Sequence, residues 1–141
     1  MVRAAKSVLK AAVATPVVLD SSCWLEFLMD TPRAALFADV LDDADTLLVP
    51  VITVYEVIKK IVRELGDDIA SSSLVLMQRS RIVNVDLALA TQAMRNSLPL
   101  ADSLIYATAQ LHGAMLWTQD QHFEGLPGVR YFQKSMHKTT E

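Results

Sequence analysis

Short apolar runs alternate with longer stretches of helical periodicity, and this alternation restricts the fold more than any other feature of the sequence. The runs are typical of buried strands, and they lie at residues 17–19, 47–49, 82–85, 114–117 and 129–132. Between them, apolar residues recur at helical spacing over 23–28, 32–41, 52–65, 72–77, 87–95 and 102–112. This order predicts a three-layer α/β/α domain with a short, mostly parallel sheet of four to five strands.

Residues with strong local preferences mark the predicted helix ends. We expect a serine, Ser21 or Ser22, to cap the first helix of the domain, and Pro32 to open the second. Gly66 and Gly113 are predicted to end the helices that precede them. Asp86 is predicted to cap the helix that begins at residue 87.

The length of 141 residues suits one domain with one core. We assign residues 17–133 to this domain, residues 1–16 to an N-terminal extension, and residues 134–141 to a polar tail that is flexible. The extension is predicted to be a short amphipathic helix or a loose arm. Its basic residue Lys10 interrupts the apolar run that a signal peptide requires.

Composition narrows the class of protein. Apolar residues make up 52% of the chain, but no run approaches the roughly 20 residues that span a bilayer, so we expect a soluble protein without a membrane partner. The single cysteine, Cys23, excludes an intramolecular disulfide and fits the reducing cytoplasm. A net charge of −3 argues against a non-specific DNA coat, although a nuclease that approaches phosphate through a metal ion is compatible with it.

Four acidic residues are predicted to meet at one edge of the sheet. Asp20 follows the first strand and Asp120 follows the fourth, while Glu56 and Asp102 lie in the first turns of two helices that start at the same edge. Taken singly, each acid has a structural explanation as a helix cap, a first-turn residue or a turn residue. Glu56 is the hardest to explain in this way, because it interrupts an apolar segment.

Four clustered carboxylates repel one another, and a hard divalent cation relieves that repulsion. Mg²⁺ and Mn²⁺ prefer oxygen ligands, and one or two such ions can activate water and stabilise charge at a phosphodiester. Zinc fits less well, because no Cys/His cluster has the usual ligand spacing. The sequence therefore predicts that Mg²⁺ or Mn²⁺ binds at Asp20, Glu56, Asp102 and Asp120.

Four segments, taken in order, resemble the successive motifs of PIN domains, with VapC-type toxins of toxin–antitoxin pairs as the closest likeness. They are residues 18–22, 54–57, 101–107 and 117–120, and the segment from 120 to 131 is similar as well. The resemblance covers about residues 17–133. It implies that the four acids form the catalytic and metal-binding quartet, and that Ser21 and Thr118 are supporting hydroxyl residues. Residues 1–16 depart from the pattern, because such toxins usually begin just before the first strand.

The same resemblance implies an endoribonuclease with an RNA substrate, a cognate antitoxin protein and a homodimeric state. Apolar residues on the helices of 22–41 and 52–65 are expected to supply the dimer contact. The antitoxin is expected to lie beside the same helices and to insert an arginine against the acids.

Two alternatives stay open. The first is a non-catalytic PIN-like module that binds RNA or protein, although the presence of all four acids argues against it. The second is an Asp-dependent phosphatase or phosphoacceptor domain with Asp20 as nucleophile, although Ser22 stands where the usual phosphatase has a second Asp. His112 and His122 have the chemistry to shuttle protons or bind metal, but His112 is interpreted as a helix-end residue and His122 as a loop residue.

Overall fold

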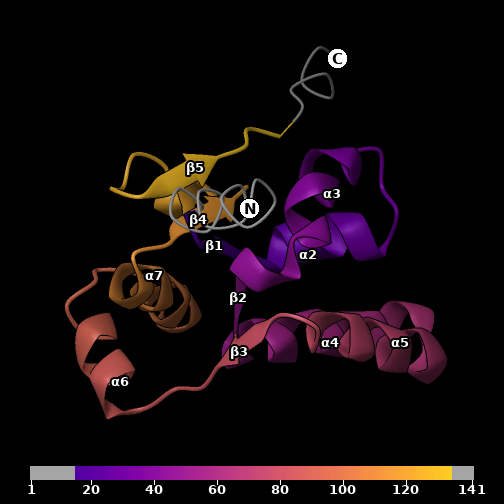
Figure 1. Ribbon diagram of the computed structural model, residues 1–141, viewed down its shortest axis with the longest axis horizontal. Coiled ribbons are helices and arrows are strands. Elements are labelled where there is room, and N and C mark those ends of the chain that lie inside the picture. The colour runs from indigo at the N-terminus through magenta and orange to yellow at the C-terminus, as the bar shows by residue number, and fades with distance from the viewer. Residues whose placement is uncertain (1–14, 135–141) are drawn as a thin grey trace, which may run out of the picture.

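The computed structural model describes residues 15–134 (Figure 1). This part of the chain contains the strands β1 (Val17–Leu19), β2 (Leu47–Pro50), β3 (Arg81–Val83), β4 (Met115–Thr118) and β5 (Val129–Tyr131). Its α-helices are α2 (Ser21–Leu28), α3 (Ala35–Asp42), α4 (Val51–Leu65), α5 (Asp67–Met77), α6 (Leu87–Ala93) and α7 (Leu100–His112). Two short 3₁₀ turns, η1 (Ala44–Thr46) and η2 (Gln121–Phe123), complete the described elements.

The five strands form one parallel sheet in the order β3-β2-β1-β4-β5. β1 lies at the centre, where Val18 is in register with Leu48 of β2 and with Leu116 of β4. Since all the strands run the same way, their carboxyl ends share one edge, which is where ligands gather in open parallel sheets. The predicted α/β/α fold with a parallel sheet is confirmed.

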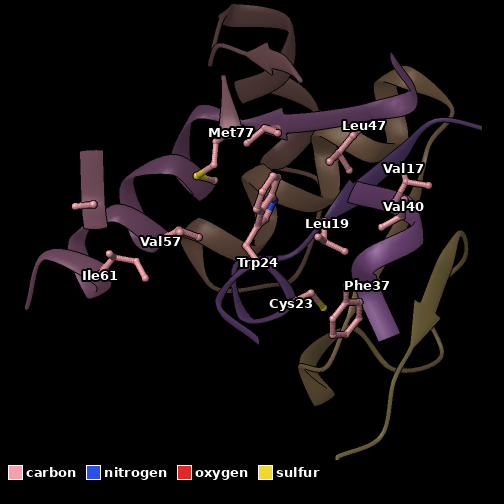
Figure 2. Packing of buried hydrophobic residues seen from close by; sticks show 12 residues of the cluster. Val17, Leu19, Cys23, Trp24, Phe37, Val40, Leu47, Val57, Ile61 and Met77 are labelled. Carbon is pink, nitrogen blue, oxygen red and sulfur yellow. The ribbon is translucent and has the colours of Figure 1, made fainter. Parts of the chain in front are cut away.

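Alternating residues of the strands enter two separate cores. Val17 and Leu19 of β1 and Leu47 of β2 face α2 to α5, where they pack with large side chains such as Trp24 and Phe37 (Figure 2). The intervening residues Val18, Leu48 and Leu116 face α7 instead, in a cluster with Ile105, Tyr106, Ala109, Ala114 and Phe123. Side chains of a strand point to alternate faces, and both faces of β1 and β2 are covered, so these two strands are apolar and buried throughout.

Two predicted helix starts were wrong. The cap of α2 is Asp20, whose carboxylate accepts a hydrogen bond from the backbone N–H of Ser21, so the helix begins one residue earlier than a serine cap would place it. Pro32 does not open α3. It lies in a turn closed by Thr31, whose carbonyl accepts from the N–H of Ala34, and the helix begins at Ala35.

Smaller differences concern the neighbours of β3. α5 begins at Asp67 rather than near residue 72, because Gly66, at φ +90°, turns the chain directly from the end of α4 into the next helix. β3 covers Arg81–Val83 rather than 82–85, since it pairs with β2 only from Leu48 to Pro50. The predicted caps at Gly66, Asp86 and Gly113 are confirmed.

The predictions for the two ends of the chain fall mostly outside the described residues. The N-terminal helix or arm predicted for residues 1–16 is described only at residues 15–16, and the tail predicted for 134–141 only at Lys134. Within residues 15–134, no helix combines the length and the apolar character needed to cross a membrane.

Candidate metal centre

Asp20 lies at the carboxyl end of the central strand and is almost fully buried, with 6% of its surface exposed. One carboxylate oxygen accepts from the backbone N–H of Ser21 at 2.8 Å, and the other accepts from the Thr118 hydroxyl at 2.6 Å. Its own N–H donates to the carbonyl of Trp117 in β4 at 2.9 Å. Both oxygens of the buried carboxylate are therefore held in fixed positions.

Burial raises the pKa of Asp20 from 3.8 to about 6. The hydrogen bonds from Thr118 and Ser21 oppose this rise, while the negative charges of Asp102 and Asp120 add to it. The charged form is thus disfavoured mainly by desolvation and secondarily by neighbouring acids. A bound cation would reverse that balance, because it stabilises the charged form.

Thr118 connects Asp20 to Asp120. Its hydroxyl donates to Asp20 and accepts from the backbone N–H of Asp120 at 2.9 Å. Asp120 then caps η2, because its carboxylate accepts from the N–H of His122 at 2.9 Å. The residue that the resemblance marks as a supporting hydroxyl is completely buried between the two acids.

Asp102 lies in the first turn of α7 and meets Asp120 through His122. The Nδ1 atom of His122 is 2.9 Å from an oxygen of Asp102 and 3.4 Å from an oxygen of Asp120. The hydrogen bond to Asp102, together with the charge of Asp120, raises the pKa of His122. The sequence interpretation of His122 as a loop residue missed this contact, although its position two residues after Asp120 was a signal for it.

Glu56 lies in the second turn of α4 and is half-buried. Its carboxylate accepts a 2.5 Å hydrogen bond from the Ser21 hydroxyl, while the N–H of Ser21 donates to Asp20. Ser21 therefore joins Glu56 to Asp20, as Thr118 joins Asp20 to Asp120. The structure therefore links the four predicted acids through the side chains between them. Ser21 connects Glu56 to Asp20, Thr118 connects Asp20 to Asp120, and His122 connects Asp120 to Asp102.

A second contact that sequence reasoning missed holds the loop after β4. Gln119 lies between Thr118 and Asp120 and is 4% exposed. Its side-chain oxygen accepts from Nε of Arg33 at 2.5 Å, and the same nitrogen is 3.5 Å from Glu26. Arg33 is 86 residues away in the sequence, so no local pattern signals this contact.

Two other potentially reactive side chains, Cys23 and His112, have structural roles. Cys23 is buried with its thiol 3.6 Å from the carbonyl of Trp117, and burial raises its pKa, so it is not an activated nucleophile. His112 lies at the end of α7, where Nδ1 is 2.9 Å from the carbonyl of Thr108. The position of His112 agrees with its interpretation as a helix-end residue.

The donor set fits a divalent cation. One ligand atom each from Asp102, Asp120 and His122 lies within 4.8 Å of the other two. Asp20 is close enough to these acids for their charges to raise its pKa. Carboxylate oxygens dominate the site, as Mg²⁺ and Mn²⁺ require, and the imidazole is the one nitrogen donor of this cluster in the described chain.

Solved structures with the same fold include a toxin and a toxin–antitoxin complex, but their sequences are distant. A toxin–antitoxin complex from Klebsiella pneumoniae matches with a TM-score of 0.70 and 22% identity over 81% of this chain and 95% of the other. The Sarcin-Ricin loop cleaving toxin VapC20 from Mycobacterium tuberculosis matches with a TM-score of 0.66 and 14% identity, over 80% and 96% of the two chains. FitAcB from Neisseria gonorrhoeae matches with a TM-score of 0.63 and 23% identity, over 83% and 96%.

Sequence comparison gives the family. No curated protein sequence matches the chain. The family model of the PIN domain, however, matches residues 17–129. This range begins with β1, ends at the first residue of β5 and contains all four acids. This match covers most of the 141 residues, and the chain belongs to the PIN-domain family.

Proposed function

We propose that this protein is a divalent-metal-dependent endoribonuclease, with Asp20, Glu56, Asp102 and Asp120 as the residues that hold Mg²⁺ or Mn²⁺ and carry the reaction. The observation that supports this most strongly is the convergence of three acids, since Asp20, Asp102 and Asp120 are connected through Thr118 and His122 at the carboxyl edge of the sheet. Four carboxylates at one edge of a PIN fold are suited to binding cations rather than to stabilising the fold.

A bound divalent cation lowers the pKa of a coordinated water and neutralises charge on a phosphodiester. The protein's own residues set the geometry around it. Thr118 and Ser21 fix the two oxygens of Asp20, so this carboxylate does not need to reorganise when a cation binds. The Ser21 hydroxyl also orients Glu56 toward the same edge of the sheet.

The choice of RNA as substrate depends on the family and on the resemblance to VapC-type toxins. The structural neighbours include a Sarcin-Ricin loop cleaving toxin and a toxin–antitoxin complex. By analogy, we assign this chain the role of a cytoplasmic toxin that a cognate antitoxin protein inhibits. The net charge of −3 agrees with a nuclease that approaches phosphate through its cation.

The test is cleavage of a labelled RNA by the purified full chain. We expect cleavage with Mg²⁺ or Mn²⁺, none with a chelator, and a loss of about 100-fold or more in the Asp102→Asn variant. Asp39→Asn, at an exposed position of α3, is the matched control and should cleave at the parent rate. Equal rates for Asp102→Asn and the parent would show the assignment to be wrong. Binding of Mn²⁺ without any cleavage would favour a non-catalytic module.

The surroundings of Asp20 argue against the phosphoacceptor alternative. The side chain is nearly inaccessible, and both of its oxygens already accept hydrogen bonds from the protein. A nucleophile needs an oxygen that an incoming phosphoryl group, which is much bulkier than a bare cation, can reach. Incubation with labelled acetyl phosphate should therefore leave the chain unlabelled, and stable incorporation that Asp20→Asn abolishes would revive this alternative.

An antitoxin would find an acidic site beside an apolar helical surface. Tyr55 on α4 exposes 57% of its surface, and apolar residues of α2 and α4, including Leu25, Leu28 and Ile58, are only partly buried. We propose that a helix of the partner lies on this surface and inserts an arginine against the acids. Changing that arginine to alanine should relieve inhibition while most of the binding is kept. Full inhibition by the alanine variant would leave simple occlusion of the surface as the better account.

We also propose a homodimer, and the exposed apolar side chains favour a contact surface other than the one expected from the sequence. Leu87, Met94 and Leu100 lie at the two ends of α6 and at the start of α7, and they expose 83%, 76% and 79% of their surfaces, more than any large apolar residue of 22–41 or 52–65. We assign the contact between two copies to this surface. Met94→Glu should shift the sedimentation coefficient from dimer to monomer, whereas Val75→Glu, at an exposed position of α5, should not. A parent chain that sediments only as a monomer would contradict the proposal.

A further inference from the structure

We propose that His122 is a third protein ligand of the cation held by Asp102 and Asp120, and that its nitrogen makes the site select Mn²⁺ and similar transition-metal ions over Mg²⁺. The inference rests on the proposed function, because it concerns the same centre. It goes further by adding a residue outside the acidic quartet and by predicting which metal the centre prefers.

The distances around His122 match those between neighbouring ligands of one ion. In an octahedral site with metal–ligand bonds of about 2.1 Å, adjacent ligand atoms lie about 3.0 Å apart and opposite ones about 4.2 Å apart. The Nδ1 atom is 2.9 Å from an Asp102 oxygen and 3.4 Å from an Asp120 oxygen. All three ligand atoms lie within 4.8 Å of one another, so they can share one ion with little movement.

The backbone around His122 is anchored, and this anchoring keeps the imidazole close to the acids. The N–H of His122 donates to the Asp120 carboxylate at 2.9 Å. The next residue, Phe123, is completely buried and packs near the Tyr106 ring of α7, with 6.2 Å between the ring centroids. Since Asp102 is also on α7, the histidine and both acids belong to two elements that pack directly on each other.

The imidazole leaves one side of the centre open. The side chain of His122 is 58% exposed, whereas those of Asp120 and Asp102 are 35% and 16% exposed. Water or a phosphate oxygen can thus approach from the solvent side while the three protein ligands occupy the other. A catalytic metal site requires such open positions.

The chemistry of the donor determines the metal preference. Mg²⁺ is a hard ion that takes oxygen ligands and holds its water tightly, so a nitrogen donor adds little to its affinity. Mn²⁺ and Co²⁺ accept imidazole more readily, and affinity for nitrogen donors rises along this series. A site with two carboxylates and one imidazole should therefore bind Mn²⁺ and Co²⁺ preferentially.

Pulsed electron paramagnetic resonance of the full chain loaded with Mn²⁺ tests the coordination directly. We expect ¹⁴N modulation from a directly bound imidazole, and its replacement by the ¹⁵N pattern when the histidines are isotopically labelled. The modulation should disappear in His122→Asn and persist in His112→Asn, whose ring lies at the far end of α7.

Calorimetric titration with each metal alone supplies the second measurement. Loss of an outer-shell partner already lowers metal affinity about 10–100-fold, so His122→Asn should lose at least about tenfold for Mn²⁺ and Co²⁺ and clearly less for Mg²⁺. Mn²⁺ binding by the parent without ¹⁴N modulation, or with equal affinity in the variant, would overturn the inference and leave the proposed function intact. Failure of the parent to bind any divalent cation would overturn both.

Discussion

Asp20 and Asp120 follow neighbouring strands and share Thr118, yet their surroundings differ sharply. Asp20 comes directly after β1, starts a helix that packs at once into the core, and is 6% exposed. Asp120 lies two residues beyond the end of β4, as the cap of the 3₁₀ turn η2, and its side chain is 35% exposed. One acid is enclosed by uncharged donors, whereas the other lies beside an exposed histidine.

This difference in burial indicates that Asp20 and Asp120 have different roles within one centre. The enclosed carboxylate has a fixed position, and its raised pKa shows that its charge is held at a cost until a cation arrives. The open pair, Asp102 and Asp120, gives access to solvent and lies beside the imidazole of His122. We therefore expect substitutions around Asp20 to alter stability strongly, and those around Asp120 to alter it weakly.

The largest change in stability is expected from Thr118→Val, which keeps the shape of a completely buried side chain but removes its hydroxyl. Asp20 then loses a donor, and the N–H of Asp120 loses its acceptor. We expect a loss of about 3 kcal/mol in the free energy of unfolding without metal, measured in urea at neutral pH.

Two controls refine the measurement on Thr118. Thr118→Ser keeps the hydroxyl and should recover most of the stability. Thr108→Val changes an equally buried threonine whose hydroxyl donates only to the Leu104 carbonyl of its own helix, and it should cost about 1 kcal/mol. Equal losses for Thr118→Val and Thr108→Val would contradict a special role for the contacts of Asp20.

The second prediction is that Asp20→Asn stabilises the metal-free chain. A rise in pKa from 3.8 to about 6 corresponds to about 3 kcal/mol of lost stability at neutral pH, because the unfolded chain ionises this group more readily. Part of the gain in stability is offset, because the amide nitrogen of Asn replaces one carboxylate oxygen and cannot accept the hydrogen bond that this oxygen received. We expect a net gain of about 1–2 kcal/mol, measured by urea denaturation with a chelator present.

The upward shift in the pKa of Asp20 determines the pH range over which this residue changes the stability of the fold. The folded chain binds the proton more tightly, so the contribution to stability is complete below about pH 4 and is lost as the pH rises through about 6. Asp20→Asn should abolish this loss. The control Asp86→Asn, at the exposed cap of α6, should change stability by no more than a few tenths of a kcal/mol, since Asn caps about as well as Asp. Added Mg²⁺ or Mn²⁺ should stabilise the parent and not Asp20→Asn.

The fold was predictable because its determinants are local and repeated. The strands β1 and β2 are short apolar runs, and buried parallel strands need that pattern on both faces. The order of the elements then fixes which chain positions reach the carboxyl edge, and Asp20 and Asp120 follow from counting residues past the strands. Boundaries were harder, as at Pro32, where the turn closed by Thr31 delays the helix by three residues.

The parts of the site that the sequence did not predict depend on contacts between side chains that are far apart in the sequence. Arg33 meets Gln119 across 86 residues, and the pattern of neither segment indicates a partner. His122 was within reach of sequence reasoning, being two residues from an expected ligand, but its contact with Asp102 depends on how η2 packs against α7. Chain topology predicts the edge at which residues gather, whereas packing determines which of them touch.

The third prediction concerns Ser21→Ala, which removes the hydroxyl that orients Glu56. Glu56 is half-buried, so water replaces part of the lost contact, and we expect a cost of about 1 kcal/mol. A double-mutant cycle with Glu56→Gln measures the interaction itself. Ser22→Ala makes the same change one residue on, without a hydrogen bond to Glu56 within residues 15–134, and should show no coupling in the cycle. Equal coupling for Ser21 and Ser22 would show that the contact with Glu56 does not contribute.

The smallest effect on stability is expected from His122, which lies beside the exposed acid Asp120. The hydrogen bond to Asp102 and the charge of Asp120 raise the pKa of this histidine above its ordinary value of 6.5, so its contribution to stability is complete below that pH and is lost as the pH rises through the raised folded value. Nuclear magnetic resonance titration of the metal-free chain should show this rise. Asp102→Asn should reverse more of it than Asp120→Asn, since the nearer oxygen belongs to Asp102.

Salt then distinguishes the two acids by their exposure. The imidazole is 58% exposed, and screening acts strongly on exposed charges but weakly on buried ones. The metal-free chain should therefore lose stability in two pH windows, one between about 4 and 6 from Asp20 and one above 6.5 from His122. High salt should reduce only the loss of stability in the upper pH window, and His122→Asn should remove that loss. If salt weakens both losses equally, Asp20 is as accessible as Asp120, and the contrast between an enclosed and an open acid is wrong.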